Sequence, residues 1–368
     1  MTPQSEIQLI AVLTALACAL PGAFLVLRRV SMLSDAISHA ILPGIVVAFF
    51  LTEDLNSPLL ILGAAATGVL TAALIETLSR TGKVREDAAI GLVFPILFSI
   101  GVILIARYAG GVHLDVDAVL LGELAFAPFD RVAFSGIDFG PKALWVMGVI
   151  LLLNAAFIAL FYKELKLSTF DPSLAAALGF SPALLHYLLM GAVSVTAVGA
   201  FDAVGSVLVV ALIVGPPATA YLLTDRLAYL LALSAGLGAA AGIAGYWASY
   251  LADASIAGSM ATMVGIFFFL AFLFAPNQGI VAGFRRSRAQ RRRFAQHMLL
   301  VHILHHENTP EAARECHPNH LQEHLRWNED IAHVAIRSAL RDGLIEPRGE
   351  LLHLTESGRQ LARVTMVA

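Results

Sequence analysis

Two side chains with metal-binding chemistry stand four residues apart where an apolar segment begins. Asp35 and His39 lie in RRVSMLSDAISHAILPG, residues 28–44, in which two arginines end one apolar segment and the next one starts. A spacing of four places both side chains on one face of a helix. An imidazole with carboxylate oxygens suits Mn²⁺, Fe²⁺ or Zn²⁺, and the chain has no thiol or methionine cluster to favour Cu⁺. Ionisable groups in such a segment are costly. We therefore expect Asp35 and His39 to contact a metal ion.

Helix breakers and one further carboxylate interrupt the apolar segments. Pro43 and Gly44 predict a helix break, because proline removes an amide donor and clashes with the preceding turn. Asp202 lies in an otherwise uncharged apolar run, so it should face a cavity or a partner, unless solvent wets it at an outer helix turn. The GPP at 215–217 predicts a second broken helix, and broken helices at membrane depth commonly line a pathway. His186, alone in its segment, is expected to be structural.

The composition is that of a membrane protein. The 368 residues are 58% apolar and 14% charged, with a mean hydropathy of +0.77, whereas soluble chains are nearer half apolar and a quarter charged. The prediction is an all-α polytopic membrane protein with about nine transmembrane helices. The two segments around Asp202 could instead form one broken or re-entrant element. The nine segments are 7–27, 36–52, 58–78, 88–108, 143–162, 184–201, 203–223, 227–250 and 257–275.

Charge predicts the orientation and a domain boundary. With the N-terminus outside, the loops on the inner side hold eight lysines and arginines and the outer loops three, which follows the positive-inside rule. Residues 1–284 carry a net charge of −6, while residues 285–368 carry +3 and nine of the twelve histidines. We predict a membrane domain at 1–284 and a cytoplasmic soluble domain at 285–368, with the boundary near 276–293.

Two loops carry possible function. The stretch 109–141 is long for a helix connection, and its Asp115, Asp117 and Glu123 either attract cations to a pore mouth or are ordinary solvated side chains. On the inner side, Asp171 and Pro172 are a helix cap and first residue. The following SLAAAL forms a short helix that ends at Gly179. This helix either docks into a groove on a partner or is a simple connector.

At these stretches the chain resembles the permease subunits of the manganese/zinc/iron ABC importers. The resemblance covers roughly residues 7–276 and is carried by SMLSDAISHAILPGI (31–45), REDAAIGLVFPILFSIGVI (85–103), VLLGELAF (119–126), DPSLAAALGFSP (171–182) and FDAVGSVLVVALIVGPPATA (201–220). It implies a bacterial inner-membrane location and a homodimeric or heterodimeric pore. It also implies a cytoplasmic ATPase pair and an extracytoplasmic metal-binding protein that delivers the ion.

The same resemblance assigns roles to residues. Asp35 and His39 look like the metal-pathway ligands, and Asp202 is a weaker candidate. The coupling helix that docks on the ATPase would contain Asp171, Pro172, Ala175, Ala176 and Gly179. The chain has no G-x-x-x-x-G-K-[ST] phosphate-binding loop, so ATP is expected on the partner subunit. We predict that the chain is not itself an enzyme and holds no permanent cofactor, the metal being its cargo.

The soluble tail has its own pattern. Helices are predicted at 294–306, 310–316, 318–326 and 328–342, followed by Gly343 and a hairpin with strands 344–346 and 351–354. IRSALRDGLIEPRGELLHLTESGRQLA resembles the winged-helix part of metal-dependent repressors of the diphtheria-toxin-repressor type. That resemblance predicts a small α+β winged-helix domain. Such a domain would either bind DNA through Arg337, Arg341 and Arg348 or act as a regulatory docking module.

Cysteine and histidine are concentrated in the tail. Cys316, His317, His320 and His324 stand close together, with His320 and His324 at helical spacing, and could sense cytoplasmic metal. Otherwise they are part of a solvated polar helix face. The leading hypothesis is thus an ABC permease for a divalent metal. Manganese is the first choice because the tail resembles metal-dependent repressors, and zinc or iron follow. The alternative is a membrane-tethered, metal-responsive DNA-binding regulator. A transporter driven by an ion gradient would not need the DPSLAAALGF helix.

Overall fold

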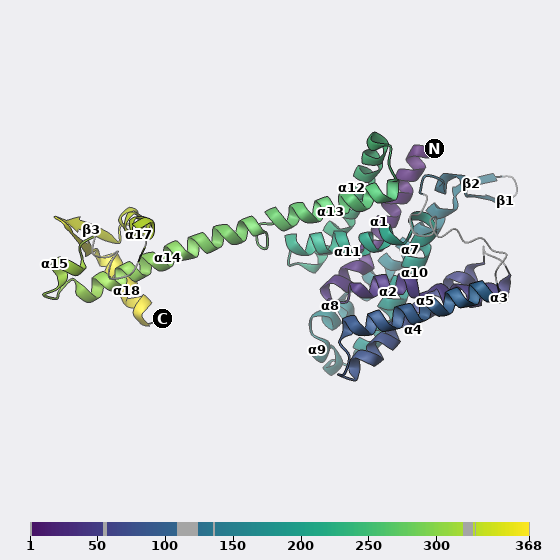
Figure 1. Ribbon diagram of the computed structural model, residues 1–368, viewed down its shortest axis with the longest axis horizontal. Helices are drawn as coiled ribbons and strands as arrows, with labels where there is room; N and C mark the ends of the chain where they lie inside the picture. Colours follow the sequence, from purple (N-terminus) through teal and green to yellow (C-terminus); the bar gives the residue numbers. More distant parts are fainter. Residues whose placement is uncertain are drawn as a thin grey trace. The chain divides into compact units, whose positions relative to one another are not determined.

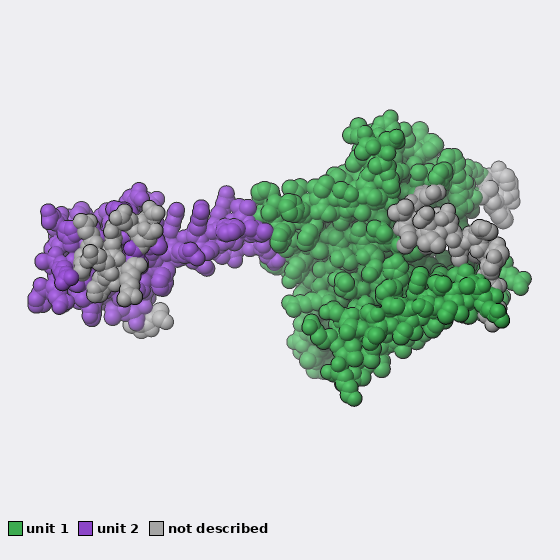
Figure 2. All heavy atoms as spheres, viewed as in Figure 1, with its two compact units in different colours: residues 1–276 green, residues 277–368 purple. Residues whose placement is uncertain are grey.

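The computed structural model describes residues 2–53, 57–108, 124–134, 137–318, 327 and 329–367. The chain forms two compact units, residues 1–276 (unit 1) and 277–368 (unit 2), which Figure 2 shows in green and purple. This division falls at the end of the apolar segments, where the arginine-rich stretch begins.

Unit 1 is almost entirely helical (Figure 1). Its helices are α1 (Pro3–Leu27), α2 (Met32–Ala40), α3 (Leu42–Thr52), α4 (Pro58–Arg80), α5 (Glu86–Tyr108), α7 (Lys142–Leu160), α8 (Tyr162–Phe170), α9 (Pro172–Ala177), α10 (Pro182–Val204), α11 (Ser206–Leu223), α12 (Leu227–Ala252) and α13 (Ile256–Phe274). Within the described part of the chain, nine helical stretches are long and apolar enough to cross a membrane, with α2 and α3 together forming one. Each overlaps one of the nine predicted segments.

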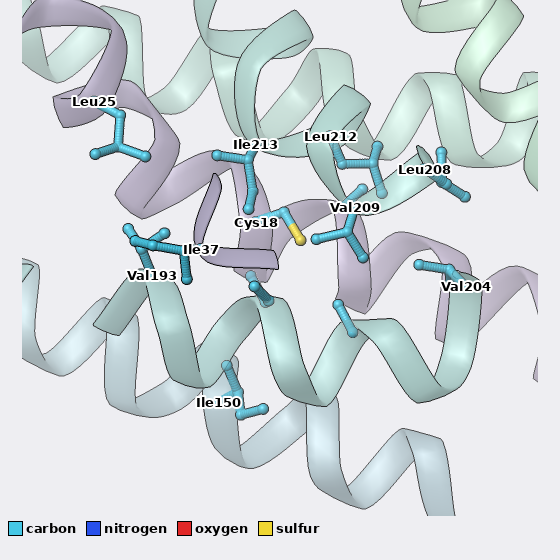
Figure 3. Packing of buried hydrophobic residues seen from close by; sticks show 14 of the residues in the cluster. Cys18, Leu25, Ile37, Ile150, Val193, Val204, Leu208, Val209, Leu212 and Ile213 are labelled. Carbon is cyan, nitrogen blue, oxygen red and sulfur yellow. The ribbon is translucent and has the colours of Figure 1, made fainter. Parts of the chain in front are cut away.

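Helix α1 is the centre of unit 1. It packs against α7, α10, α11 and α12, and Phe24 and Leu25 near its end are fully buried. Helices α3, α4 and α5 pack on one another, and α4 also packs against α10. The central core, drawn in Figure 3, combines side chains of α1, α2, α7, α10 and α11: Cys18, Leu25, Ile37, Ile150, Val193, Val204, Leu208, Val209, Leu212 and Ile213.

Proline interrupts the helices in one of the two predicted places. Helix α2 ends at Ala40, and α3 begins after Ile41, just before Pro43. By contrast, α11 continues through Pro216 and Pro217, so the predicted break at 215–217 is wrong. Proline fits the helical φ angle, so the helix can continue although each proline removes one backbone hydrogen bond and crowds the preceding turn. The hydroxyl of Thr219 adds a bond to the Gly215 carbonyl oxygen at 2.8 Å.

The elements around Asp202 are two separate helices rather than one re-entrant element. A single residue, Gly205, joins α10 to α11 with φ 78° and ψ 163°. This backbone conformation is essentially restricted to glycine, which explains the residue type at the junction.

A small hairpin precedes α7. A 3₁₀ turn, η1 (Ala127–Phe129), leads into β1 (Arg131–Phe134), which pairs antiparallel with β2 (Ile137–Pro141) through Phe134 and Ile137. This hairpin is the described part of the long predicted loop. The acidic residues predicted to attract cations there, Asp115, Asp117 and Glu123, lie outside the described residues.

Unit 2 consists of four helices and a two-stranded antiparallel sheet among its described residues. These are α14 (Ile280–His306), α15 (Ala312–Glu315), α17 (Glu329–Arg341), β3 (Ile345–Arg348), β4 (Leu351–Leu354) and α18 (Glu356–Val367). Helices α17 and α18 and strand β4 pack on α14 around their own apolar core. The helix predicted at 318–326 falls almost wholly outside the described residues.

Three predicted boundaries in unit 2 are wrong. Helix α14 begins at Ile280 rather than at residue 294, because its arginines are good helix formers and continue the helix toward the N-terminus. Helix α15 covers four residues instead of the predicted seven. Strand β3 extends to Arg348, and Gly349, with φ 69°, supplies the turn.

Candidate metal pathway and coupling helix

Asp35 and His39 come together on α2 as their spacing predicts. His39 Nε2 lies 3.6 Å from Asp35 Oδ1, and the side chains are 28% and 49% exposed. The His39 ring also contacts the ring of Phe94 on α5, with 5.7 Å between centroids. One face of the imidazole is therefore fixed by packing, while carboxylate and imidazole both remain accessible. This arrangement can offer a nitrogen and an oxygen ligand to a passing cation.

The helix break leaves a backbone carbonyl group near His39 without its usual helical donor. In an uninterrupted helix, the N–H of residue 43 would bond to the carbonyl oxygen of His39, but Pro43 has no N–H. The Gly44 N–H bonds to the Ile41 carbonyl oxygen at 3.0 Å, three residues back instead of the helical four. The His39 carbonyl oxygen is thus released from its usual helical bond one residue from the break. Carbonyl oxygen suits hard divalent cations.

The other predicted pathway residue, Asp202, lies on a different helix from Asp35 and His39. Asp202 lies in the last turn of α10, two residues before that helix ends at Val204. Only its backbone position is described. Its role in the pathway remains a prediction.

The predicted short helix between α8 and α10 is present as α9. Asp171 caps it by accepting a hydrogen bond from the Leu174 N–H at 2.9 Å, and Pro172 is its first residue. Ala175 is fully buried against the protein, whereas Ala176 is exposed. At its end, the Gly179 N–H bonds to the Ala176 carbonyl oxygen at 3.0 Å. The φ of 88° at Gly179 explains why glycine ends this helix.

The outer surface of α9 is apolar. Leu174, Leu178 and Phe180 are 46%, 61% and 41% exposed. The segment is anchored through α8, because the Arg28 guanidinium donates to the hydroxyls of Ser168 at 3.0 Å and Thr169 at 3.1 Å. A short helix with exposed apolar side chains on a fixed base can fill a groove on a partner protein.

Unit 2 separates the residues predicted for sensing and DNA contact. The Cys316 side chain is buried in the apolar core, and this burial raises the pKa of its thiol. His317 is partly buried, while His320 and His324 lie outside the described residues. Arg337 and Arg341 are exposed on α17. The Arg348 guanidinium donates to Glu346 Oε1 on its own strand at 2.8 Å.

Sequence reasoning missed a different group in unit 2. His302, His306 and Glu315 place one ligand atom each within 4.8 Å of one another. The spacing of four between the two histidines is visible in the sequence. Their partner on α15 depends on how the chain folds back after α14, which the sequence pattern does not specify.

Comparison with known proteins extends over both units. Residues 5–275 match the family model described as the ABC 3 transport family. The chain is 49% identical to the zinc transport system membrane protein TroD of Treponema pallidum, over 98% of each chain. It is 50% identical to the manganese transport system membrane protein MntD of Bacillus subtilis, over 73% of this chain and 91% of that protein.

Solved structures agree with the sequence comparison. The structure of PsaBC from Streptococcus pneumoniae in complex with Fab matches with a TM-score of 0.63 and 28% identity, over 76% of this chain and 94% of that one. The chain belongs to the ABC 3 transport family. It is an integral inner-membrane protein. The similarity to TroD also includes unit 2, which the family model does not cover.

Proposed function

We propose that the chain is the permease subunit of an ATP-driven importer for a divalent transition metal, manganese first, then zinc or iron. The observation that carries this proposal is the pairing of Asp35 and His39 at 3.6 Å, partly exposed, beside a helix break. A buried structural pair would be closed off, whereas a transport site needs accessible and incomplete coordination. The relatives named above for zinc and manganese support a metal cargo.

The proposed assembly has three partners. A cytoplasmic ATPase would receive α9 in a groove, an extracytoplasmic metal-binding protein would deliver the ion, and a second permease protomer would complete the pore. The exposed side chains of Leu174, Leu178 and Phe180 support the first contact. ATP would bind to the ATPase subunit alone, so this chain would transport without being an enzyme.

Metal uptake in cells tests the pathway. Asp35→Ala and His39→Ala would each be expressed with the ATPase and the binding protein, and accumulation of Mn, Zn and Fe would be measured together. Met32→Ala is the matched control, because Met32 is exposed on the same helix and carries no charge. We expect uptake of one metal to collapse in both variants and to persist in the control. Wild-type accumulation of all three metals at normal protein level would refute the pathway.

Association with the ATPase tests the coupling helix separately. Leu178→Asp would place a charge on the exposed apolar surface at the end of α9, and we expect less ATPase to co-purify with it. Leu223→Asp is a control of similar chemistry at another helix end that is 36% exposed. Equal recovery of the ATPase with both variants would refute docking through α9.

Unit 2 is proposed to be a winged-helix regulatory module, in which α17 is followed by the β3–β4 hairpin. A specific observation supports the alternative of a membrane-tethered DNA-binding regulator. Arg285, Arg288, Arg292 and Arg293 line a cavity of about 400 Å³ between α14 and α17, and arginines can bind phosphates. Deleting residues 285–368 separates the two. Retained uptake with unchanged promoter activity supports a transport module, whereas lost promoter control with normal uptake supports the regulator.

A further inference from the structure

We propose that unit 2 contains a divalent transition-metal site formed by His302 and His306 of α14 and Glu315 of α15. Their three ligand atoms lie within 4.8 Å of one another. The site is separate from the Asp35–His39 pair, and it consists of different residues from the proposed cysteine–histidine cluster at 316–324. It would take Zn²⁺, Mn²⁺ or Fe²⁺, because two imidazoles and a carboxylate are ligands common to these ions.

The geometry needs only small adjustments to hold an ion. Ligand atoms in a tetrahedral zinc site are about 3.4 Å apart, given metal–ligand distances of about 2.0–2.2 Å. His302 Nε2 already lies 3.7 Å from Glu315 Oε2. The rings of His302 and His306 stand one helical turn apart with 4.8 Å between centroids. To bring all three atoms around one ion, the side chains of His306 and Glu315 would turn and His302 Nε2 would release its bond to the Glu315 backbone oxygen.

The burial of the group favours a ligand role over a solvated surface. His302 is 7% exposed and Glu315 is 8% exposed, while the His306 side chain is 17% exposed. Burying a carboxylate beside two imidazoles is costly unless charge and hydrogen bonds compensate it. A bound cation would add to this compensation, and the partly exposed His306 would provide an entry route.

Nearby contacts fix the ligands. His302 Nε2 donates a hydrogen bond to the Glu315 backbone oxygen at 3.0 Å, which orients the ring toward α15, and an ion bound at this nitrogen would take the place of that bond. Glu311 Oε2 lies 3.9 Å from His306 Nδ1 on the open side. A carboxylate near a metal-bound imidazole orients the ring and strengthens binding. The ion would therefore link α15 to α14, which are connected by the loop between His306 and Ala312.

The site can be measured with the full-length protein in detergent. The starting variant would carry Asp35→Ala and His39→Ala, which removes the proposed pathway ligands. It would be stripped with chelator and titrated with Zn²⁺ by calorimetry. Adding His306→Ala or Glu315→Gln should weaken binding at least about tenfold, since even indirect partners of a metal change affinity by that amount. His305→Ala is the matched control, because His305 is exposed on the same helix and lies outside the group.

Hydrogen exchange gives a second measurement that does not depend on affinity. Zn²⁺ should slow amide exchange at 312–316 in the starting variant and in the His305→Ala control, but not after His306→Ala. Thermal unfolding without metal checks that His306→Ala is folded. Zinc binding and protection that His306→Ala and Glu315→Gln leave unchanged would overturn the proposal. A negative uptake result for Asp35 and His39 would not affect it, so the two proposals fail independently.

Discussion

The side-chain amide of Asn154 donates a hydrogen bond to the backbone carbonyl oxygen of Ala17, with 3.0 Å between nitrogen and oxygen. Ala17 is four residues before Pro21, which has no N–H to complete this bond within α1. The same amide donates to Thr196 Oγ1 at 2.7 Å. A buried side chain of α7 thus supplies the bond that α1 lacks and ties three helices together.

Replacing this amide should destabilise unit 1. Asn154→Leu would leave the Ala17 carbonyl without a donor, at a cost of about 1 kcal/mol, as for hydrogen bonds between membrane helices. The measurement is the thermal midpoint of the purified protein in detergent. Pro21→Ala is the informative second change, because it restores the N–H of residue 21. We expect Asn154→Leu to cost less in the Pro21→Ala protein. An equal cost in both proteins would contradict this explanation.

Gly22 should not tolerate a side chain. A Cβ there would overlap the backbone carbonyl of Ile213 on α11, whose own helical donor is missing because residue 217 is proline. Gly22→Ala should separate α1 from α11 and lower stability by about 1–3 kcal/mol. Gly148→Ala on α7 is the control, because open space surrounds a Cβ there. The thermal midpoint of Gly22→Ala should fall below that of Gly148→Ala. Similar midpoints for the two variants would argue against close contact at Gly22.

Removing Arg131 should expose a carboxylate that is costly to bury. Glu6 on α1 is 4% exposed, and Arg131 Nη1 lies 3.1 Å from its Oε2. Arg131→Met would lower stability, because the carboxylate loses its charged donor. Adding Glu6→Gln removes that charge and should restore part of the loss. The thermal midpoints of the single and double variants check this. A double variant less stable than Arg131→Met would refute the pairing.

Asp138 gives the hairpin a defined dependence on pH. The Gly140 N–H, and then the Arg131 guanidinium, bond to its carboxylate and lower its pKa. A depressed carboxyl pKa stabilises the folded state above the unfolded pKa of about 3.9, and this contribution disappears as pH falls through the folded pKa. Wild type should therefore exceed Asp138→Asn in thermal midpoint at pH 6. The difference should shrink as the pH falls below the unfolded pKa of about 3.9 and through the lower folded pKa. A difference in thermal midpoint that is constant with pH would contradict this role of the Asp138 carboxylate.

The sequence was sufficient for features that depend on local chemistry. Hydropathy is a property of each segment, so all nine spans were predicted, and the four-residue spacing of Asp35 and His39 was enough to pair them. The cap at Asp171 and the break before Pro43 likewise follow from the residues themselves. Features that depend on distant contacts were not predictable. The continuity of α11 through Pro216 goes with close packing on α1, and Glu315 meets His302 only through the fold of unit 2.

Gly205 has a consequence for motion. One residue in a conformation restricted to glycine joins α10 to α11, so the two helix ends must stay close together. At its other end, α10 contacts α8 and α9. We therefore expect a displacement of α9 to move α10 and, through this one-residue connection, to act on α11. An insertion at this joint would leave each helix intact and uncouple their movement.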